Sequence, residues 1–74
     1  MTETIMNLHG LKCPLPALRV RQKLMGLNSG DLIVAECTDP MAAIDIPNLL
    51  RQTGDALESK TEADGVLTFR IRKK

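Results

Sequence analysis

The spacing of apolar positions predicts alternating strands and helices in the first half of the chain. Ile5–Leu8 is a short apolar run that predicts a strand. From Leu15 to Leu27 the apolar period becomes helical. The stripe that this helix would turn toward a core consists of Ala17, Val20, Leu24 and Leu27. Leu32–Cys37, with the sequence LIVAEC, is mostly apolar and contains β-branched residues, so it predicts a second, buried strand.

The next part of the chain contains two signals for the start of a helix. The segment Thr38–Pro40 (TDP) pairs a capping aspartate with a proline at the first helical position. A second signal follows in DIPN, where Asp45 can cap and Pro47 falls in the first turn. We therefore expect the main helix at Ile46–Thr53, behind a short lead-in turn, with Gly54 closing its C-terminal end.

Two final strands are predicted at Ala56–Glu62 and Val66–Arg72. They are joined by Asp64-Gly65, a dipeptide typical of tight hairpins. The predicted order is therefore β-α-β-α-β-β. Each β-α-β step is expected to be right-handed, which places both helices on one face of a single sheet. We expect an α/β (α+β) two-layer sandwich that residues 1–74 form as one domain.

Composition limits the classes of protein to which the chain can belong. Phe69 is the only aromatic residue among 74, so the core must be built mainly from aliphatic side chains. A net charge of +1 with one aromatic residue gives little basis for direct nucleic-acid binding, which we do not expect. No apolar run is long enough to cross a membrane, and the N-terminal segment lacks the apolar region of a secretory signal. We therefore expect a cytoplasmic protein without membrane association, in which the two cysteines stay reduced.

The segment GLKCPLP (Gly10–Pro16) places a cysteine between a predicted strand and a predicted helix. The carboxyl ends of parallel strands lie at one edge of an open α/β sheet, where such folds place their sites. We therefore expect Cys13 to lie near Thr38 and Asp39, which follow the second strand. Position alone leaves a second interpretation open, in which Cys13 is a small, buried hydrophobic residue.

Two placements of the helix start are compatible with the prolines after Cys13. If Pro14 is the first helical residue, Cys13 is the N-cap, and the unpaired N–H groups of Leu15 and Ala17 lie near the sulfur. If the helix begins at Pro16, the cysteine lies just outside it on a stiff loop. Both placements present the thiol at the start of a helix.

The residues around Cys13 favour sulfur chemistry over acid–base catalysis. Lys12 and the positive end of the helix dipole both favour the thiolate, so we expect a lowered pKa for the thiol. The only histidine, His9, is expected to face solvent at the end of the first strand. Asp45 is expected to cap a helix rather than to act as an acid. There is no C-x-x-C motif, and His9, Cys13 and Cys37 do not match the spacing of a zinc site, so we expect no bound metal.

Cys37 and the basic residues of the first predicted helix each have two interpretations. Cys37 can be a resolving thiol for Cys13, but it shares a strand face with apolar neighbours, and we expect it in the core. Arg19 and Lys23 lie four residues apart and project together. They form either a solvated helix face or a docking site for an acidic partner surface.

The sequence CPLP at Cys13–Pro16 resembles the CPxP signature of the TusA/SirA-like sulfur carriers. The similarity extends over almost the whole chain through TDP, DIPNLLRQTGDAL and the closing FRIRKK. The resemblance implies a mixed four-stranded sheet in the order 1-2-4-3. It also implies that Cys13 accepts a persulfide sulfur from a cysteine desulfurase or rhodanese-like donor and passes it to an acceptor protein, in the best-known members toward tRNA thiolation. The chain departs from many members at Asn7, where they carry aspartate, and at His9.

The sequence therefore leads to one main functional hypothesis and two alternatives. The main hypothesis is a sulfur carrier that acts between partner proteins rather than as a stand-alone enzyme, with no cofactor other than the covalent sulfur on Cys13. The residues expected to support that cysteine are Lys12, Pro14, Leu15, Pro16 and Ala17. One alternative is a regulatory docking module that uses the basic first helix and in which the thiol has no role. The other is a redox sensor in which Cys13 and Cys37 form a disulfide.

Overall fold

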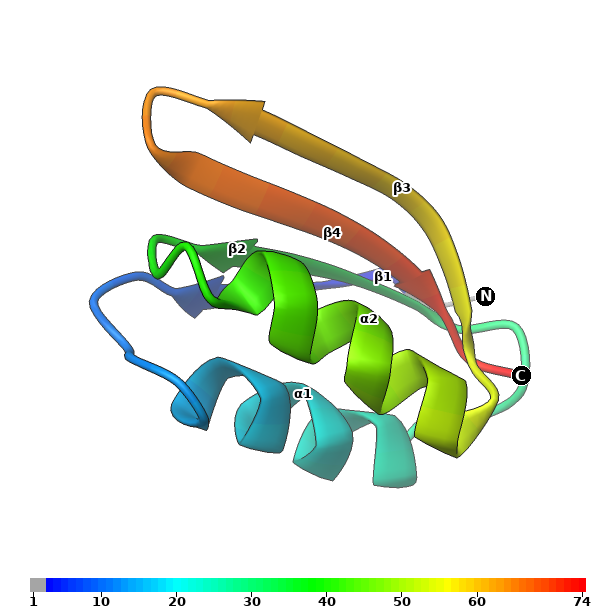
Figure 1. The fold of residues 1–74 in the computed structure, drawn as a ribbon. Helices are drawn as coiled ribbons and strands as arrows, with labels where there is room; N and C mark the ends of the chain where they lie inside the picture. The colour runs from blue at the N-terminus through cyan, green and yellow to red at the C-terminus, as the bar shows by residue number, and fades with distance from the viewer. Residues whose placement is uncertain (1–2) are drawn as a thin grey trace.

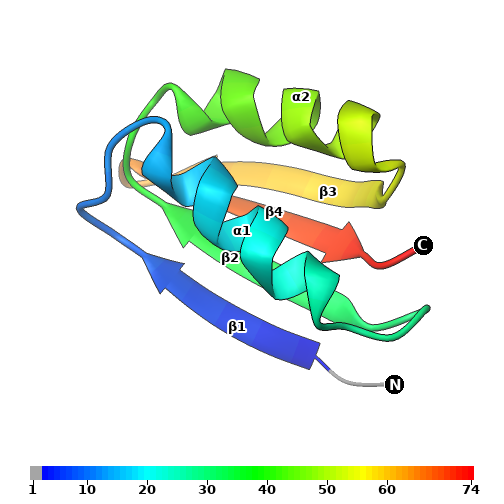
Figure 2. The same cartoon turned by 90° about the horizontal axis from the view of Figure 1, so that it is seen from below.

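The computed structural model describes residues 3–74 and has two helices packed against a four-stranded sheet (Figure 1). In chain order the elements are β1 (Glu3–Leu8), α1 (Leu15–Met25), β2 (Leu32–Cys37), α2 (Ala42–Thr53), β3 (Ala56–Ala63) and β4 (Val66–Arg72). The strand order is β1-β2-β4-β3, with β1 and β2 parallel and the other neighbours antiparallel. Figure 2 shows both helices on the same side of the sheet. The predicted α+β class, element order and mixed sheet are confirmed.

The core lies between the sheet and the two helices and contains a single aromatic ring. The central strands turn alternate side chains toward the helices, and the buried ones are Ile33, Ala35, Cys37, Leu67, Phe69 and Ile71. Val20 and Leu24 of α1 and Ile46 of α2 belong to the same cluster. Phe69 has no exposed surface, so the one aromatic residue is fully used in the core. The predicted apolar stripe of the first helix is confirmed at its two central residues.

The first residues of α1 differ from both predicted helix starts. Pro14 occupies the N-cap position and Leu15 is the first helical residue. The placements that made Cys13 the N-cap or Pro16 the first residue are therefore both wrong. A proline in the first turn removes no intrahelical hydrogen bond, because its N–H would have no partner there. The helix ends at Met25, two residues earlier than predicted.

The second helix is one continuous unit that starts earlier than predicted. α2 begins at Ala42, four residues before Ile46, and contains Pro47 in its interior. The N–H of Ala42 donates to the Asp39 carbonyl over 3.0 Å, so helical turns begin directly after the TDP segment. A proline inside a helix removes one hydrogen bond but does not prevent the others. Asp45 consequently lies in the first turn of α2 and not at its N-cap.

Two predicted turns contain residues with left-handed backbone conformations. Gly54 has φ +85° at the C-terminal end of α2, and its N–H donates to the Leu50 carbonyl over 2.8 Å. Asp64 (φ +52°) and Gly65 (φ +77°) form the tight turn between β3 and β4. Both turn predictions are confirmed.

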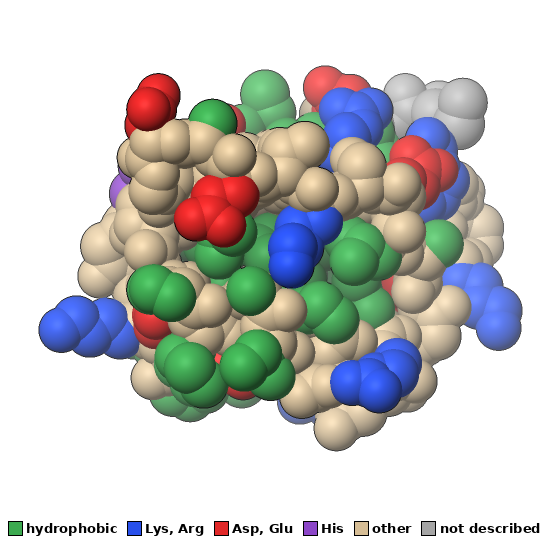
Figure 3. All heavy atoms as spheres, turned by 45° about the horizontal axis from the view of Figure 1, so that its top comes forward, with side chains coloured by type: hydrophobic (Ala, Val, Ile, Leu, Met, Phe, Trp, Pro, Cys, Tyr) green, Lys and Arg blue, Asp and Glu red, His purple; other side chains and the backbone are tan. Residues whose placement is uncertain are grey.

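The edge strand β3 is less covered by the helices than the rest of the sheet. Figure 3 shows apolar side chains in a hollow between β3 and α2. The hollow is lined at one end by Pro47, Leu50 and Leu57 and at the other by Ala43 and Leu67. Within residues 3–74 no helix is long and apolar enough to span a membrane.

Candidate functional site

The loops after β1 and β2 meet at the carboxyl edge of these parallel strands, as predicted. The N–H of Gly10 donates to Thr38 Oγ1 over 2.9 Å. The N–H of Cys13 donates to Asp39 Oδ2 over 2.6 Å. These two bonds join the β1–α1 loop to the β2–α2 loop. Gly10 has φ +79°, a conformation that glycine adopts without steric strain, so the chain can turn sharply as it leaves β1.

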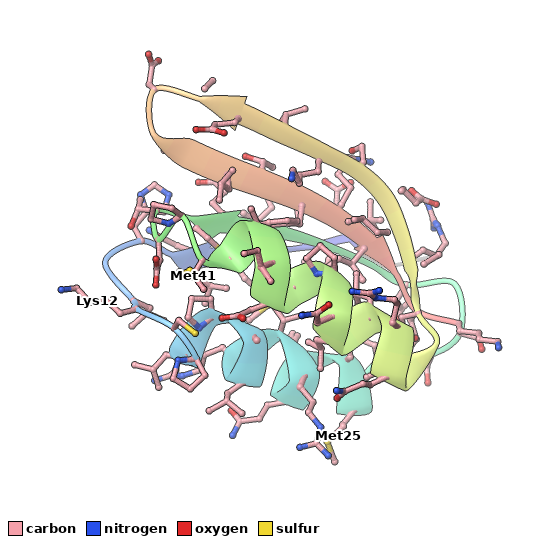
Figure 4. The ribbon with its side chains drawn as sticks, viewed as in Figure 1. Lys12, Met25 and Met41 are labelled. Carbon is pink, nitrogen blue, oxygen red and sulfur yellow. The ribbon has the colours of Figure 1, made fainter. Side chains whose placement is uncertain are left out.

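Cys13 is exposed and lies one residue before the N-cap of α1. The peptide bond that joins it to Pro14 is cis. The N–H of Leu15 donates to the Lys12 carbonyl over 2.8 Å, so this group is not directed at the sulfur as predicted. The Lys12 side chain points away from both helices (Figure 4). The alternative in which Cys13 is a buried hydrophobic residue is wrong.

The thiol of Cys13 has a partner that sequence reasoning did not assign. Its S–H donates to Asp45 Oδ2, with the sulfur 2.5 Å from the oxygen. The pKa of Cys13 is raised, first by this hydrogen bond, then by partial desolvation and by the negative charges of Asp45 and Asp39. The predicted lowering of this pKa is therefore wrong in direction. The hydrogen bond to Asp45 and the charges of Asp45 and Asp39 act against the effects expected from Lys12 and the helix dipole.

Asp39 fixes the backbone on both sides of the site. Its Oδ2 atom accepts the N–H of Cys13, and its Oδ1 atom accepts the N–H of Met41 over 3.0 Å. These two bonds, together with the charge of Lys12, lower the pKa of the Asp39 carboxyl group. The sequence indicated Asp39 as the cap of a helix with Pro40 at its first position, but α2 begins at Ala42 and Met41 occupies the N-cap position. The bond of Asp39 to the cysteine loop depends on a tertiary contact that no local pattern encodes.

Asp45, which accepts the Cys13 S–H bond, also lines a groove between α1 and α2. The groove has a volume of about 470 Å³ and is lined by Pro14, Ala17, Leu18, Arg21, Asp45, Asn48, Leu49, Gln52 and Thr53. Leu18 of this lining is an exposed large apolar residue, and three more, Leu15, Met41 and Ile44, lie on or just before the first turns of the two helices. Apolar residues exposed together beside a reactive group are typical of a protein-binding surface. The groove was not predicted from the sequence.

The supporting and docking residues predicted around Cys13 are not all at the site. Pro14 and Ala17 line the groove, whereas Pro16, the second residue of α1, is buried. Arg19 and Lys23 are both exposed, one helical turn apart, and neither lines the groove. The basic residue of α1 that does line the groove is Arg21. It is separated from Leu18 by three residues and from Pro14 by seven, so the helical period places all three on one flank.

His9 and Cys37 lie where the sequence predicted. His9 is exposed after β1, and its Nε2 atom is 3.0 Å from Glu36 Oε1. Cys37 has no exposed surface and belongs to the core, where burial raises its pKa to about 11. Both cysteines are free thiols. In the part of the chain that the structure describes, no three or more His, Cys, Asp or Glu side chains are grouped so that they could hold a metal ion.

Comparisons with known proteins show which family the chain resembles over most of its length. A family model described as Sulfurtransferase TusA matches residues 4–73. A relative from Allochromatium vinosum named Sulfur carrier protein TusA is 38% identical over 64 residues, which cover 86% of this chain and 84% of the relative. A relative of the same name from Pseudomonas putida strain F1 is 33% identical over 72 residues, covering 97% and 90% of the two chains. A Neisseria meningitidis serogroup A relative, provisionally named a sulfur carrier, is 38% identical over 74 residues, the whole of both chains.

Proposed function

The chain belongs to the TusA sulfurtransferase family, and from this we propose that it is a sulfur carrier in which Cys13 holds the transferred sulfur as a persulfide. The observation that carries the proposal is the contrast between the two cysteines. Cys13 is exposed on a loop whose backbone is fixed by Asp39, whereas Cys37 has no exposed surface. A thiol that exchanges sulfur with other proteins must be reachable by them, and Cys13 meets this requirement.

The proposed chemistry is an exchange at sulfur that needs no acid–base catalyst for a carbonyl group. The Cys13 thiolate attacks the outer sulfur of a persulfide on the donor protein. A new bond forms between Sγ and that sulfur, the sulfur–sulfur bond of the donor breaks, and its electron pair remains on the donor cysteine. The proton that Cys13 loses is balanced by the proton that the donor thiolate takes up. In the discharge step the acceptor thiolate attacks the outer sulfur of the Cys13 persulfide, and Cys13 leaves as the thiolate. No external oxidant or reductant is required in either step.

The partners that fit this chemistry are proteins with a reactive cysteine. We propose a cysteine desulfurase or a rhodanese-like enzyme as the donor and a second protein thiol as the acceptor, in a relay such as the one that leads to tRNA thiolation. The reducing cytoplasm suits such a relay, because the carrier cysteine must return to the thiol after each cycle. The exposed basic pair Arg19 and Lys23 on α1 is our proposed docking site for an acidic surface of one of these partners.

The proposal is tested by loading the purified protein with sulfur. Incubation with a cysteine desulfurase and cysteine, without added reductant, is expected to increase the intact mass by one sulfur atom. The Cys13→Ser variant is expected to gain none, whereas Cys37→Ala is expected to load to the wild-type extent. Loading of Cys13→Ser at the wild-type level would show that the sulfur is carried elsewhere. It would also favour the docking-module alternative, in which the thiol has no role.

A further inference from the structure

The immediate surroundings of the Cys13 sulfur are unusual for a nucleophile. A cysteine attacks as the thiolate, and reactive cysteines usually lie next to positive charges that favour this form. Here the S–H donates to the Asp45 carboxylate, and the backbone N–H of the same cysteine donates to a second carboxylate, that of Asp39. Both negative charges act against ionisation of the thiol. The free protein therefore holds this cysteine in its less reactive, protonated form.

The Asp45 carboxylate is also open to a partner. Asp45 is only partly buried and lines the groove between α1 and α2. Within residues 3–74 the ion pairs do not include Asp45, although Arg21 lines the same groove. Lys12, the charged neighbour on the other side of the cysteine, points away from both helices. A positive group brought by another protein can therefore reach this carboxylate without displacing an existing cation.

We propose that Asp45 is a positioning residue that keeps Cys13 protonated in the free carrier, and that a sulfur donor releases the thiolate by placing a positively charged side chain on Asp45. The inference rests on the proposed function of Cys13 as the sulfur-bearing residue. An ion pair with the donor would occupy the oxygen that accepts the S–H bond and would offset the charge that opposes the thiolate. The groups that face the sulfur are Asp45 from α2 and Asp39 from the β2–α2 loop. Among the basic residues, Lys12 precedes the cysteine and acts on Asp39, and Arg21 of α1 lines the same groove as Asp45.

The proposed release step balances in atoms and charge. As the donor cation pairs with Asp45, the Cys13 proton leaves, and Sγ attacks the outer sulfur of the donor persulfide. The sulfur–sulfur bond of the donor breaks, and its cysteine leaves as a thiolate, which takes up a proton equal to the one released. The hydrogen bond to Asp45 also protects the exposed Cys13 thiol from oxidation between transfer cycles, because the thiolate is the form that oxidants attack. Sulfur acceptance would then depend on docking of a donor with the matching charge.

The test uses small charged disulfides, which report the electrostatics at Cys13 without any partner protein. We would measure the rates at which cystamine, a cationic disulfide, and dithiodiglycolate, an anionic one, modify the Cys13 thiol. Asp45→Asn is the test variant, and Asp64→Asn, in the exposed β3–β4 turn, is the control with the same change of charge. The wild type and Asp64→Asn are expected to react faster with cystamine. In Asp45→Asn the ratio of the two rates is expected to fall by at least about threefold.

A second readout follows alkylation of Cys13 by iodoacetamide, a neutral reagent, as a function of pH. Without the charge of Asp45 the pKa of the thiol is expected to fall in Asp45→Asn, which raises the thiolate fraction at pH 7. Because a less basic thiolate is also a weaker nucleophile, the rate is expected to rise about threefold. Equal rate ratios and equal pH profiles in Asp45→Asn and the wild type would overturn the proposal.

The wild type provides a check that does not depend on whether the variant folds. Its alkylation rate is expected to rise with a midpoint above the ordinary cysteine pKa of about 8.5. A midpoint below that value would overturn the proposal by itself. Failure of the carrier function would be seen separately, as an absence of persulfide loading from a desulfurase while these disulfide and alkylation rates still depend on Asp45.

Discussion

The sulfur of Cys13 and the Oδ2 atom of Asp45 are 2.5 Å apart, although the two residues are separated by 32 positions in the sequence. The contact joins the loop before α1 to the first turn of α2. It therefore couples the reactive cysteine to the relative position of the two helices, between which the groove lies. The bonds of Asp39 to Cys13 and Met41 reinforce the same junction.

Asp39 is expected to make the stability of the folded protein depend on pH in the acidic range. Its pKa is lower in the folded state than in an unfolded chain, because its carboxylate accepts the N–H groups of Cys13 and Met41. The contribution of Asp39 to the free energy of unfolding is therefore complete above the ordinary aspartate pKa of about 4. This contribution is lost as the pH falls through the lower pKa of the folded state. The urea midpoint of Asp39→Asn should lie below that of the wild type at pH 7, and the gap should narrow toward pH 3. A gap that stays constant over this range would contradict the assignment.

Gly54 is expected to be sensitive to a side chain, whereas Gly26 is not. Gly54 has φ +85°, so Gly54→Ala should cost about 1–2 kcal/mol of unfolding free energy. Gly26 has φ −98°, and an added Cβ would lie 3.7 Å from the Lys23 carbonyl oxygen, an ordinary contact. Gly26→Ala should therefore leave the stability unchanged or raise it by up to about 1 kcal/mol. Urea denaturation of the two variants measures the difference, and equal effects would argue against the left-handed turn at Gly54.

Phe69 is expected to be the most sensitive position of the core. It is fully buried among aliphatic side chains, so Phe69→Ala should cost about 3–5 kcal/mol, whereas Phe69→Leu should cost about 1.5 kcal/mol or less. A chain of this length is expected to have a total stability of only about 4–11 kcal/mol. Phe69→Ala should therefore lose a large part of the stability of the protein. Truncation of the partly exposed Leu57 is the control, and a similar loss there would contradict the proposed position of the core.

The basic pair on α1 is expected to affect partner binding without affecting the fold. Reversal of both charges in Arg19→Glu with Lys23→Glu should weaken binding to the sulfur donor at least about tenfold at low ionic strength. The effect should shrink as salt is added, since exposed charges are screened. The control reverses two exposed charges on other elements, Arg51 and Lys60. Binding that weakens equally in both double variants would show that α1 is not the docking surface.

Much of the fold could be predicted because local patterns and the tertiary structure agree. The alternation at Val66–Arg72 predicted β4 with its residue bounds unchanged, and the Asp64-Gly65 dipeptide predicted the turn before it. The start of α2 could not be predicted, because a proline was expected to mark the first turn. In the folded chain Pro47 lies in the interior of α2, because the helical hydrogen bonds already begin at Ala42. The proline removes only its own hydrogen bond.

The cysteine itself could be predicted as the functional residue, whereas its electrostatic environment could not. The position of Cys13 after a strand and before a helix is a local property of the sequence. The hydrogen bond and the charges that raise the thiol pKa come from Asp45 and Asp39, which reach the cysteine through tertiary contacts. The sequence predicted Asp45 as a helix cap, whereas the structure places it in the first turn of α2, bonded to the Cys13 sulfur. The predicted sign of the pKa shift was wrong because it left out both carboxylates.

The most direct test of the central claim is to locate the transferred sulfur within the chain. Trypsin cleaves after Lys and Arg, so Cys13 falls in the peptide 13–19 and Cys37 in the peptide 24–51. After loading by a cysteine desulfurase and capping with iodoacetamide, mass spectrometry of the two peptides assigns the added sulfur to one cysteine. We predict that the persulfide is found in peptide 13–19 and that peptide 24–51 gains no sulfur atom. A persulfide confined to peptide 24–51, or absent from both peptides, would contradict it.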